Sequence, residues 1–373
     1  MTFKILLFLS LFLSTFTFSS GGDGSGLYKI YYPIVLFFTL TTLFFSKGLK
    51  VYKDVYLFFL FFLLYLLVSF LNNASVDFYI VAAVLAVCGL SLSLSILNDP
   101  VSAVLVIRAF ILFNMAFLTY QFLYTVILGE GVYLHGKLFS FSREVYSLVE
   151  MGTFYRMSGY HLEPGSYATV IALMLFLYKY LNNGKVETPI HFCSLSLLLT
   201  FSVIGFILFT IFYLSYFKDT LSFKRSFFIL MVLALFCSIL IYEMGVFSYV
   251  EQRFAFGASG DSSASVKMAN LYYFIQNYDL EKFLIGYGMK PDLILCSTCG
   301  HVQSNGVIFN LFFLTGVILT FFFFALLYYS GALKVFLPLI IGFSIIRYGP
   351  SFIIFWLVFS FMLNARSYKY AIQ

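Results

Sequence analysis

Long apolar stretches follow one another along almost the whole chain, and they constrain its fold more than any other feature. Stretches such as 3–19 and 101–128 are long enough to cross the hydrocarbon core of a bilayer as α-helices. In composition, 62% of the residues are hydrophobic and only 10% are charged, which is not typical of a soluble domain. The stretches do not alternate between apolar and polar residues, so a transmembrane β-barrel is excluded. The sequence therefore predicts an all-α, polytopic membrane protein.

Basic residues in the short loops indicate the orientation, because cytoplasmic loops carry an excess of Lys and Arg. Lys47, Lys50 and Lys53 follow the second stretch, so this loop is expected in the cytoplasm. We predict one integral membrane domain, 1–373, with about 12 transmembrane helices and both ends inside. The expected spans are 3–19, 30–46, 52–71, 78–97, 101–128, 165–181, two crossings within 190–217, 226–245, 305–329, 336–347 and 351–363.

The stretch 190–217 has two interpretations, because its length suits either one tilted helix or two short crossings. A single crossing would place Lys218, Lys224 and Arg225 outside, against the positive-inside rule. Two short crossings that break near 202–205 keep these three residues inside. Short crossings are tolerated where protein covers the exposed backbone. We therefore predict a helical hairpin here.

Charged residues concentrate in two long segments between spans, at about 129–163 and 246–304. Counting crossings from a cytoplasmic N-terminus places both segments on the outer side. Apolar residues at helical spacing in 142–151 predict a helix on the membrane surface. The net charge of +6 is scattered at helix ends, so it does not indicate nucleic-acid binding.

The first segment ends in a group of ionisable residues, Tyr-Arg-Met-Ser-Gly-Tyr-His-Leu-Glu-Pro-Gly-Ser-Tyr-Ala at 155–168. Such residues at the edge of a membrane helix tend to mark a site. Arg156 suits a phosphate group, which a guanidinium binds in bidentate fashion, or else a lipid headgroup. Glu163 suits an acid or base, or else the start of a helix together with Pro164. His161 is expected to make structural hydrogen bonds or to join the site.

The second segment offers Arg253 and His301. Arg253 has the same two interpretations as Arg156. A histidine could deprotonate a sugar hydroxyl at neutral pH. Alternatively, His301 helps Asn305 to cap the following helix.

Two of the five cysteines, Cys296 and Cys299, lie in this outer segment, and the other three lie in apolar stretches. Two cysteines with His301 make an incomplete zinc site, so no metal site is predicted. An oxidising compartment favours a disulfide between Cys296 and Cys299. The chain also has no glycine-rich nucleotide motif. An enzyme facing outward therefore needs a pre-activated substrate, such as a lipid-linked pyrophosphate.

Three segments carry a family resemblance. Arg156, Ser158, Gly159, Glu163 and Pro164 fit an Arg-x-Ser-Gly-x-x-x-Glu-Pro-like motif. The segment 283–288 reads Phe-Leu-Ile-Gly-Tyr-Gly, and 301–316 begins with His-x3-Asn and ends in a glycine within an apolar helix. In their order and topology these segments resemble the O-antigen polymerases (Wzy-type) of the O-antigen ligase/polymerase superfamily.

The resemblance has three departures. Lys267 stands where the family often has an arginine. The Arg-x10-Gly spacing described for some polymerases is not met at Arg156 or Arg253. The hairpin lacks the Ser-Arg pair common in ligases, which favours a polymerase over a ligase.

The resemblance implies a GT-C-like fold and an inverting glycosyltransferase that needs no metal, nucleotide or other cofactor. It would join undecaprenyl-pyrophosphate-linked repeat units at the periplasmic face of the bacterial inner membrane. The partners implied are lipid-linked glycans, membrane lipids and a chain-length regulator protein. A ligase that transfers glycan to lipid A-core and a transporter of lipid-linked sugars are the alternatives. The site residues implied are His301 and Glu163 for catalysis, Arg156, Arg253 and Lys267 for the pyrophosphate, and Tyr160, His161 and Arg143 as further candidates.

Overall fold

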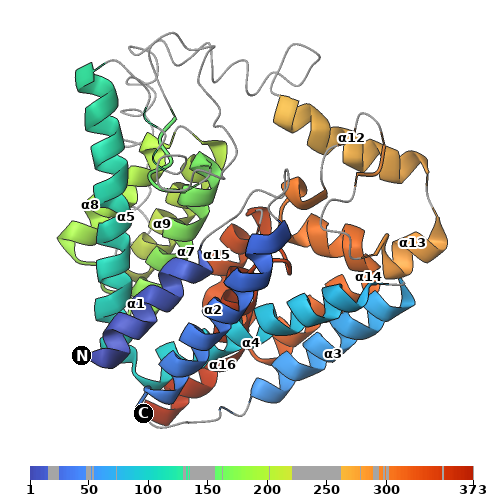
Figure 1. Ribbon diagram of the computed structural model, residues 1–373, viewed down its shortest axis with the longest axis horizontal. Coiled ribbons are helices and arrows are strands. Elements are labelled where there is room, and N and C mark those ends of the chain that lie inside the picture. Colours follow the sequence, from blue (N-terminus) through green and yellow to red (C-terminus); the bar gives the residue numbers. More distant parts are fainter. Residues whose placement is uncertain are drawn as a thin grey trace.

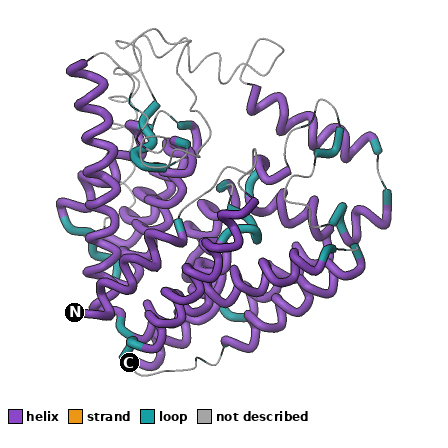
Figure 2. The backbone as a smooth tube through the Cα atoms, in the orientation of Figure 1, coloured by secondary structure: helices purple, strands orange, loops and turns teal. Residues whose placement is uncertain are grey.

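The computed structural model describes residues 1–15, 25–47, 52, 54–72, 74–128, 132, 134, 156–161, 163–200, 202–220, 262–277, 279–288, 294–296, 299, 302–346 and 348–372. Across these residues the protein is all-α, with 13 α-helices, one short 3-10 helix and no strand (Figure 2). The predicted spans agree with the described helices to within a few residues at most ends. The span expected at 226–245 and the surface helix expected at 142–151 lie outside the described residues.

The helices are α1 (Thr2–Ser14), α2 (Ser25–Phe44), α3 (Val55–Leu71), α4 (Val76–Asn98), α5 (Pro100–Leu128), α7 (Pro164–Leu181), α8 (Thr188–Leu199), α9 (Val203–Thr220), α12 (Ser262–Gln276), α13 (Leu280–Ile285), η2 (Val302–Asn305), α14 (Val307–Tyr329), α15 (Ala332–Ile345) and α16 (Ile353–Ile372). In Figure 1, α5, α7, α8 and α9 form one side of the molecule, and α12, α13 and α14 form the other.

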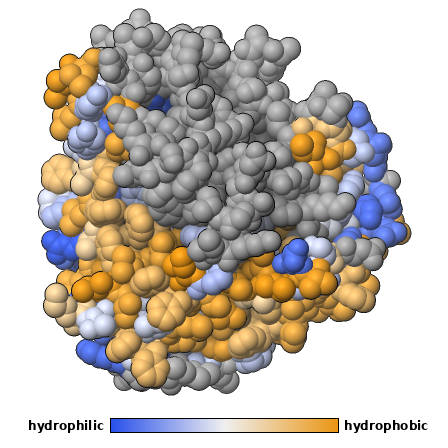
Figure 3. All heavy atoms as spheres, in the orientation of Figure 1, coloured by the Kyte–Doolittle hydropathy of each residue, from blue (hydrophilic) through white to orange (hydrophobic). Residues whose placement is uncertain are grey.

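Three of the described helices are long and apolar enough to cross a membrane, over Val76–Asn98, Pro100–Thr125 and Val307–Tyr329. Several more described helices are apolar but shorter. Many large apolar side chains are exposed, and Figure 3 shows a broad hydrophobic surface across the lower part of this face. Together these helices indicate a membrane protein.

The loop before α3 and the turn between α4 and α5 lie together at one end of the helix bundle. Lys47 Nζ lies 3.8 Å from Asp99 Oδ2. The Tyr52 hydroxyl donates to the Leu97 carbonyl at 3.1 Å. We refer to this end, defined by Lys47 and Asp99, as the Asp99 end.

The opposite end joins α3 to the α13 region. Asn72 follows α3, and its Nδ2 donates to the Ile285 carbonyl at 2.9 Å. At the same end, Tyr31 of α2 donates its hydroxyl to the Leu13 carbonyl of α1. We refer to this end, defined by Asn72 and Ile285, as the Asn72 end.

Among the described helices, α4 and α16 make the most extensive contact with each other. Gly89 makes this crossing possible, because an added Cβ would lie 2.4 Å from Trp356 Cβ. The Trp356 indole donates to the Pro350 carbonyl at 2.8 Å, which satisfies the only polar atom of its side chain. The rings of Phe58 and Tyr65 from α3 pack edge-on against Trp356. These contacts fix α3, α4 and α16 relative to one another.

The expected hairpin is present, because α8 and α9 are separated by residues 200–202. Near this turn Gly205 lies on the Leu197 carbonyl, where an added Cβ would lie 2.5 Å from the oxygen. At the other end of the pair, His191 Nδ1 lies 3.2 Å from the Tyr213 hydroxyl. The two helices therefore run antiparallel, and the chain returns to the level at which α8 began.

The hairpin brings its second arm back to the end of α7. Lys179, in the last turn of α7, donates from Nζ to Ser215 Oγ at 2.6 Å. The predicted helical hairpin is confirmed, and the crossing of the membrane by each of its arms stays a prediction. The side chain of Lys218 and all of Lys224 and Arg225 lie outside the described residues.

Two helices depart from the straight spans that the sequence predicts. α14 is kinked at Gly316, which has φ 72° and ψ −175°. α15 contains Pro338 and is kinked at Phe336, two residues earlier. A proline removes one helical hydrogen bond and crowds the preceding turn, which explains the kink in α15.

Candidate functional site

The conspicuous polar group at 155–168 forms a tight turn on the side of α5. The turn spans Arg156–His161 and is closed by the His161 amide, which donates to the Ser158 carbonyl at 3.0 Å. Gly159 has φ +58° and packs against α5, where an added Cβ would lie at an ordinary contact distance of 3.5 Å from the Leu118 nitrogen. The positive φ is what favours glycine here. We refer to this feature as the 156–161 turn.

Two amide side chains of α5 hold the 156–161 turn in place. Gln121 Oε1 accepts the Ser158 amide at 2.9 Å and the Gly159 amide at 2.8 Å. Asn114 Oδ1 lies 2.7 Å from His161 Nε2. Residues 114 and 121 are seven apart, so both amides project from one face of the helix. Neither residue was predicted from the sequence, although two amides on one face of an apolar span are a usable signal.

Aromatic rings enclose the middle of the turn. The Tyr160 ring packs against Phe12, Phe113 and Phe117 and stacks on the His161 ring at 4.4 Å. Tyr160 and His161 are each only 2% exposed. Burial raises the pKa of Tyr160, while hydrogen bonds from neighbouring side chains oppose the rise. The side chains of Tyr160 and His161 therefore pack the 156–161 turn against its aromatic neighbours.

The two ionisable residues at the edges of the turn are less enclosed. Arg156 and Glu163 are both half-buried. Glu163 is the residue before α7, and its carbonyl accepts the Ser166 amide at 3.0 Å, while Pro164 occupies the first helical position. The expected helix start is thus present. Its side chain makes no capping hydrogen bond to α7.

The second and third segments that carry the resemblance meet at a pair of glycines. Gly286 follows α13, and Gly316 is the kink of α14; each has φ near +75° and extended ψ, a conformation essentially limited to glycine. An added Cβ on Gly316 would lie 2.1 Å from the Leu284 carbonyl oxygen. The amides of Tyr287 and Gly288 donate to α14 carbonyls just before the kink, at 2.8 and 3.2 Å. The glycine pair therefore joins α13 to α14 through the backbone.

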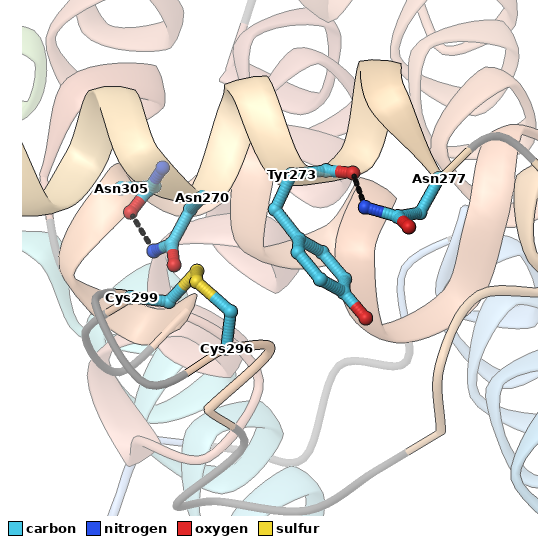
Figure 4. The surroundings of a disulfide bond; sticks show 6 residues. All are labelled: Asn270, Tyr273, Asn277, Cys296, Cys299 and Asn305. Atoms are coloured by element: carbon cyan, nitrogen blue, oxygen red, sulfur yellow. Dashed lines mark hydrogen bonds between the residues drawn. A yellow bond between two sulfur atoms is a disulfide. The ribbon is translucent and has the colours of Figure 1, made fainter.

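The segment after the glycine pair leads through a disulfide to η2. Cys296 and Cys299 are joined, with their Cα atoms 4.9 Å apart, below α12 (Figure 4). Asn270 of α12 donates from Nδ2 to Asn305 Oδ1 at 2.9 Å (Figure 4). Asn305 does not cap the next helix as the sequence suggested, because Gly306 holds that position. Its amide instead links η2 to α12.

The residues just before α16 link the start of α14 to the 156–161 turn. Gly349 lies on Asn310 of α14, where an added Cβ would lie 2.5 Å from Nδ2. The adjacent Tyr348 neighbours Tyr160 of the 156–161 turn. Residues 348–349 thus lie near both the start of α14 and the 156–161 turn.

The structure places part of the predicted site. Arg156, Tyr160, His161 and Glu163 lie together, and the Cys296–Cys299 pair lies below α12. Lys267 lies in α12, with its side chain outside the described part. Arg143, Arg253 and His301 lie outside the described residues. Among the residues that are described, no group of three His, Cys, Asp or Glu side chains could hold a metal ion.

One charged residue within a span has a role that the sequence did not assign. Arg108 of α5 pairs with Glu187, just before α8, at 2.8 Å. Both side chains are partly exposed, at 36% and 45%. The pair ties α5 to the start of the hairpin, well away from the 156–161 turn.

Comparison with known proteins adds no family to this description: no family model, no curated protein and no solved structure matches the chain.

Proposed function

We propose that this protein is a polysaccharide polymerase that joins undecaprenyl-pyrophosphate-linked repeat units, as the resemblance at 155–168, 283–288 and 301–316 implies. The observation that carries the proposal is the placement of these three segments. The last two are joined by the glycine pair, while Gly349 lies against Asn310 and Tyr348 neighbours Tyr160 of the first. Segments that are far apart in the chain are thus linked through residues 348–349, as a shared active site would require.

The orientation in the membrane is part of the proposal. The disulfide lies at the Asn72 end, and disulfides persist in oxidising compartments such as the periplasm. The loop with Lys47 lies at the opposite end, as a cytoplasmic loop would. About 12 spans, two large periplasmic loops, a GT-C-like arrangement and an inner-membrane location fit this orientation.

The reaction transfers a growing glycan from its pyrophosphate carrier to the hydroxyl of a new lipid-linked repeat. The hydroxyl oxygen bonds to the anomeric carbon, and the bond from that carbon to the pyrophosphate oxygen breaks with inversion. The hydroxyl proton passes to a base, for which we propose His301 or Glu163. Undecaprenyl pyrophosphate leaves, and we assign Arg156, Arg253 and Lys267 to its charge.

The half-buried state of Arg156 and Glu163 supports these roles. A guanidinium that is partly shielded from water binds phosphate oxygens more strongly than one in bulk solvent. Tyr160 and His161, which are buried, serve in the proposal as packing for the turn. A chain-length regulator protein is the expected partner.

A deletion strain tests the proposal through the lipopolysaccharide ladder. A polymerase deletion retains core carrying one repeat unit and loses the rest of the ladder. Loss of every repeat, with polymer accumulating on the lipid carrier, would instead identify a ligase. Loss of every repeat with single lipid-linked units on the cytoplasmic side would identify a transporter. Either of the last two results overturns the proposal.

A further inference from the structure

The side chain of Gln121 joins the two ends of the first large outer segment, 129–163. Its Nε2 donates to the Val132 carbonyl at 2.6 Å, where the segment begins. Its Oε1 accepts two amides, of Ser158 and Gly159, where the segment ends. Gln121 itself is 4% exposed. One buried amide therefore fixes both ends of a segment that is more than 20 residues long.

Glutamine is suited to this position by its donor and acceptor groups. An amide oxygen has two lone pairs, and both are used here by backbone N–H groups. The amide nitrogen supplies the donor that a backbone carbonyl needs. An apolar side chain of the same size would leave three buried backbone groups without this partner, which is strongly unfavourable.

The position of Arg156 depends on these hydrogen bonds. Arg156 stands two residues before Ser158, so its Cα lies within about 7 Å of the Ser158 Cα along the chain. The residues that follow, Met157 and Ser158, are 3% and 1% exposed and leave the backbone little room to shift. The backbone from which the Arg156 side chain extends is therefore held in a fixed position.

We propose that Gln121 is a positioning residue, which sets the place of the Arg156 guanidinium for binding a diphosphate. The inference rests on the proposed function, in which Arg156 binds the pyrophosphate of the lipid carrier. Gln121 itself does not touch the substrate. It acts through the 156–161 turn.

The first test measures the turn directly. In Gln121→Met the amides of Ser158 and Gly159 lose their acceptor, so their hydrogen exchange should speed up by at least about tenfold. Thr125→Val is the matched control, because Thr125 Oγ1 donates only to the Gln121 carbonyl within α5. Gln121→Glu keeps the acceptor and should keep both amides protected. Unchanged exchange in Gln121→Met would overturn the inference.

The second test measures binding of farnesyl pyrophosphate to the full chain in nanodiscs, with farnesol as the uncharged reference. Arg156→Ala and Gln121→Met should each weaken binding of the pyrophosphate by about tenfold or more, and neither should affect farnesol. The double variant should bind no more weakly than Arg156→Ala alone, since both changes remove one interaction. Thr125→Val should bind as the unmodified chain does.

The outcomes separate the inference from the function on which it rests. If Arg156→Ala weakens binding but Gln121→Met does not, the positioning role is wrong and the diphosphate role of Arg156 stands. If the two changes add in the double variant, Gln121 acts by another route and the inference fails. If Arg156→Ala leaves binding unchanged, the diphosphate role itself is wrong, and the inference falls with it.

Discussion

At the scale of single residues, the 156–161 turn divides its polar side chains into two kinds. His161 and Tyr160 are enclosed, with a hydrogen bond to Asn114 and an aromatic shell. Arg156 and Glu163 lie at the edges and remain half-buried. Our proposal therefore assigns chemistry at the turn to the two edge residues.

The geometry of guanidinium binding gives the first prediction. We expect Arg156→Lys and Arg253→Lys each to lose most polymerisation while the protein inserts normally. Lysine keeps the charge but not the bidentate contact, and losing one such contact to a transition state costs roughly 3 kcal/mol, or about a hundredfold in rate. The assay is complementation of a deletion strain, with ladder length on a gel read beside a blot for protein level. A full-length ladder from both variants would return these arginines to lipid headgroup binding, which follows net charge.

The disulfide gives a second prediction at this scale. Cys296 and Cys299 should be recovered as one linked peptide from intact cells whose thiols were blocked before lysis. Cys88 and Cys193 are buried and unlinked, so they serve as internal controls for reduced cysteine. Mass spectrometry of non-reduced peptides decides the matter. Two blocked thiols at 296 and 299 would contradict the prediction.

At the scale of elements, the contact between α13 and α14 depends on two glycines in addition to side-chain packing such as that of Phe283 on Phe312. Each is in a conformation that costs other residues about 1–3 kcal/mol. Each also lies too close to the partner backbone for a Cβ. The two effects act together, so this contact has little tolerance for substitution.

We expect Gly316→Ala and Gly286→Ala each to lower the thermal unfolding temperature by several degrees, because strain and overlap together exceed about 2 kcal/mol. Gly184→Ala is the matched control. Gly184 also has positive φ, at +81°, but nothing lies within 4 Å of an added Cβ. Size-exclusion chromatography of heated samples gives the measurement. An unfolding temperature for Gly316→Ala equal to that of Gly184→Ala would show that the close contact is unimportant.

The α8–α9 hairpin gives the other prediction at this scale. A cysteine introduced at Thr220, the last residue of α9, should stay unlabelled by a membrane-impermeant reagent applied from the periplasm. The chain returns to the end of α7 where Lys179 bonds Ser215, which we assign to the cytoplasm. Labelling from outside in intact cells would reverse the orientation of the hairpin, and with it the count of spans.

At the scale of the whole molecule, the sequence predicts the helices well because a bilayer demands long apolar stretches. The break between α8 and α9 was predicted from the charges of the following loop, and its position from the residues at 202–205. The kink at Gly316 was not, because a single glycine in an apolar helix does not show whether another backbone approaches it. Its partner, Gly286, is 30 residues away in the chain.

The candidate site was predictable only in part for a related reason. Clusters of ionisable residues such as Arg156 and Glu163 are visible in an apolar sequence. The residues that position them are single amides, Asn114 and Gln121, whose partners are backbone groups and leave no mark in the pattern. Sequence therefore indicates where ionisable residues are concentrated and not what holds them in place.

The glycine pair also bears on how the chain enters the membrane. Carbonyls of α14 near the kink are paired with donors from 287–288, and a carbonyl left bare in lipid is strongly unfavourable. The ribosome makes residues 287–288 before α14, so these donors have already left it when the kinked helix emerges. The donors precede the carbonyls that need them, and α14 can bend during insertion without waiting for any later part of the protein.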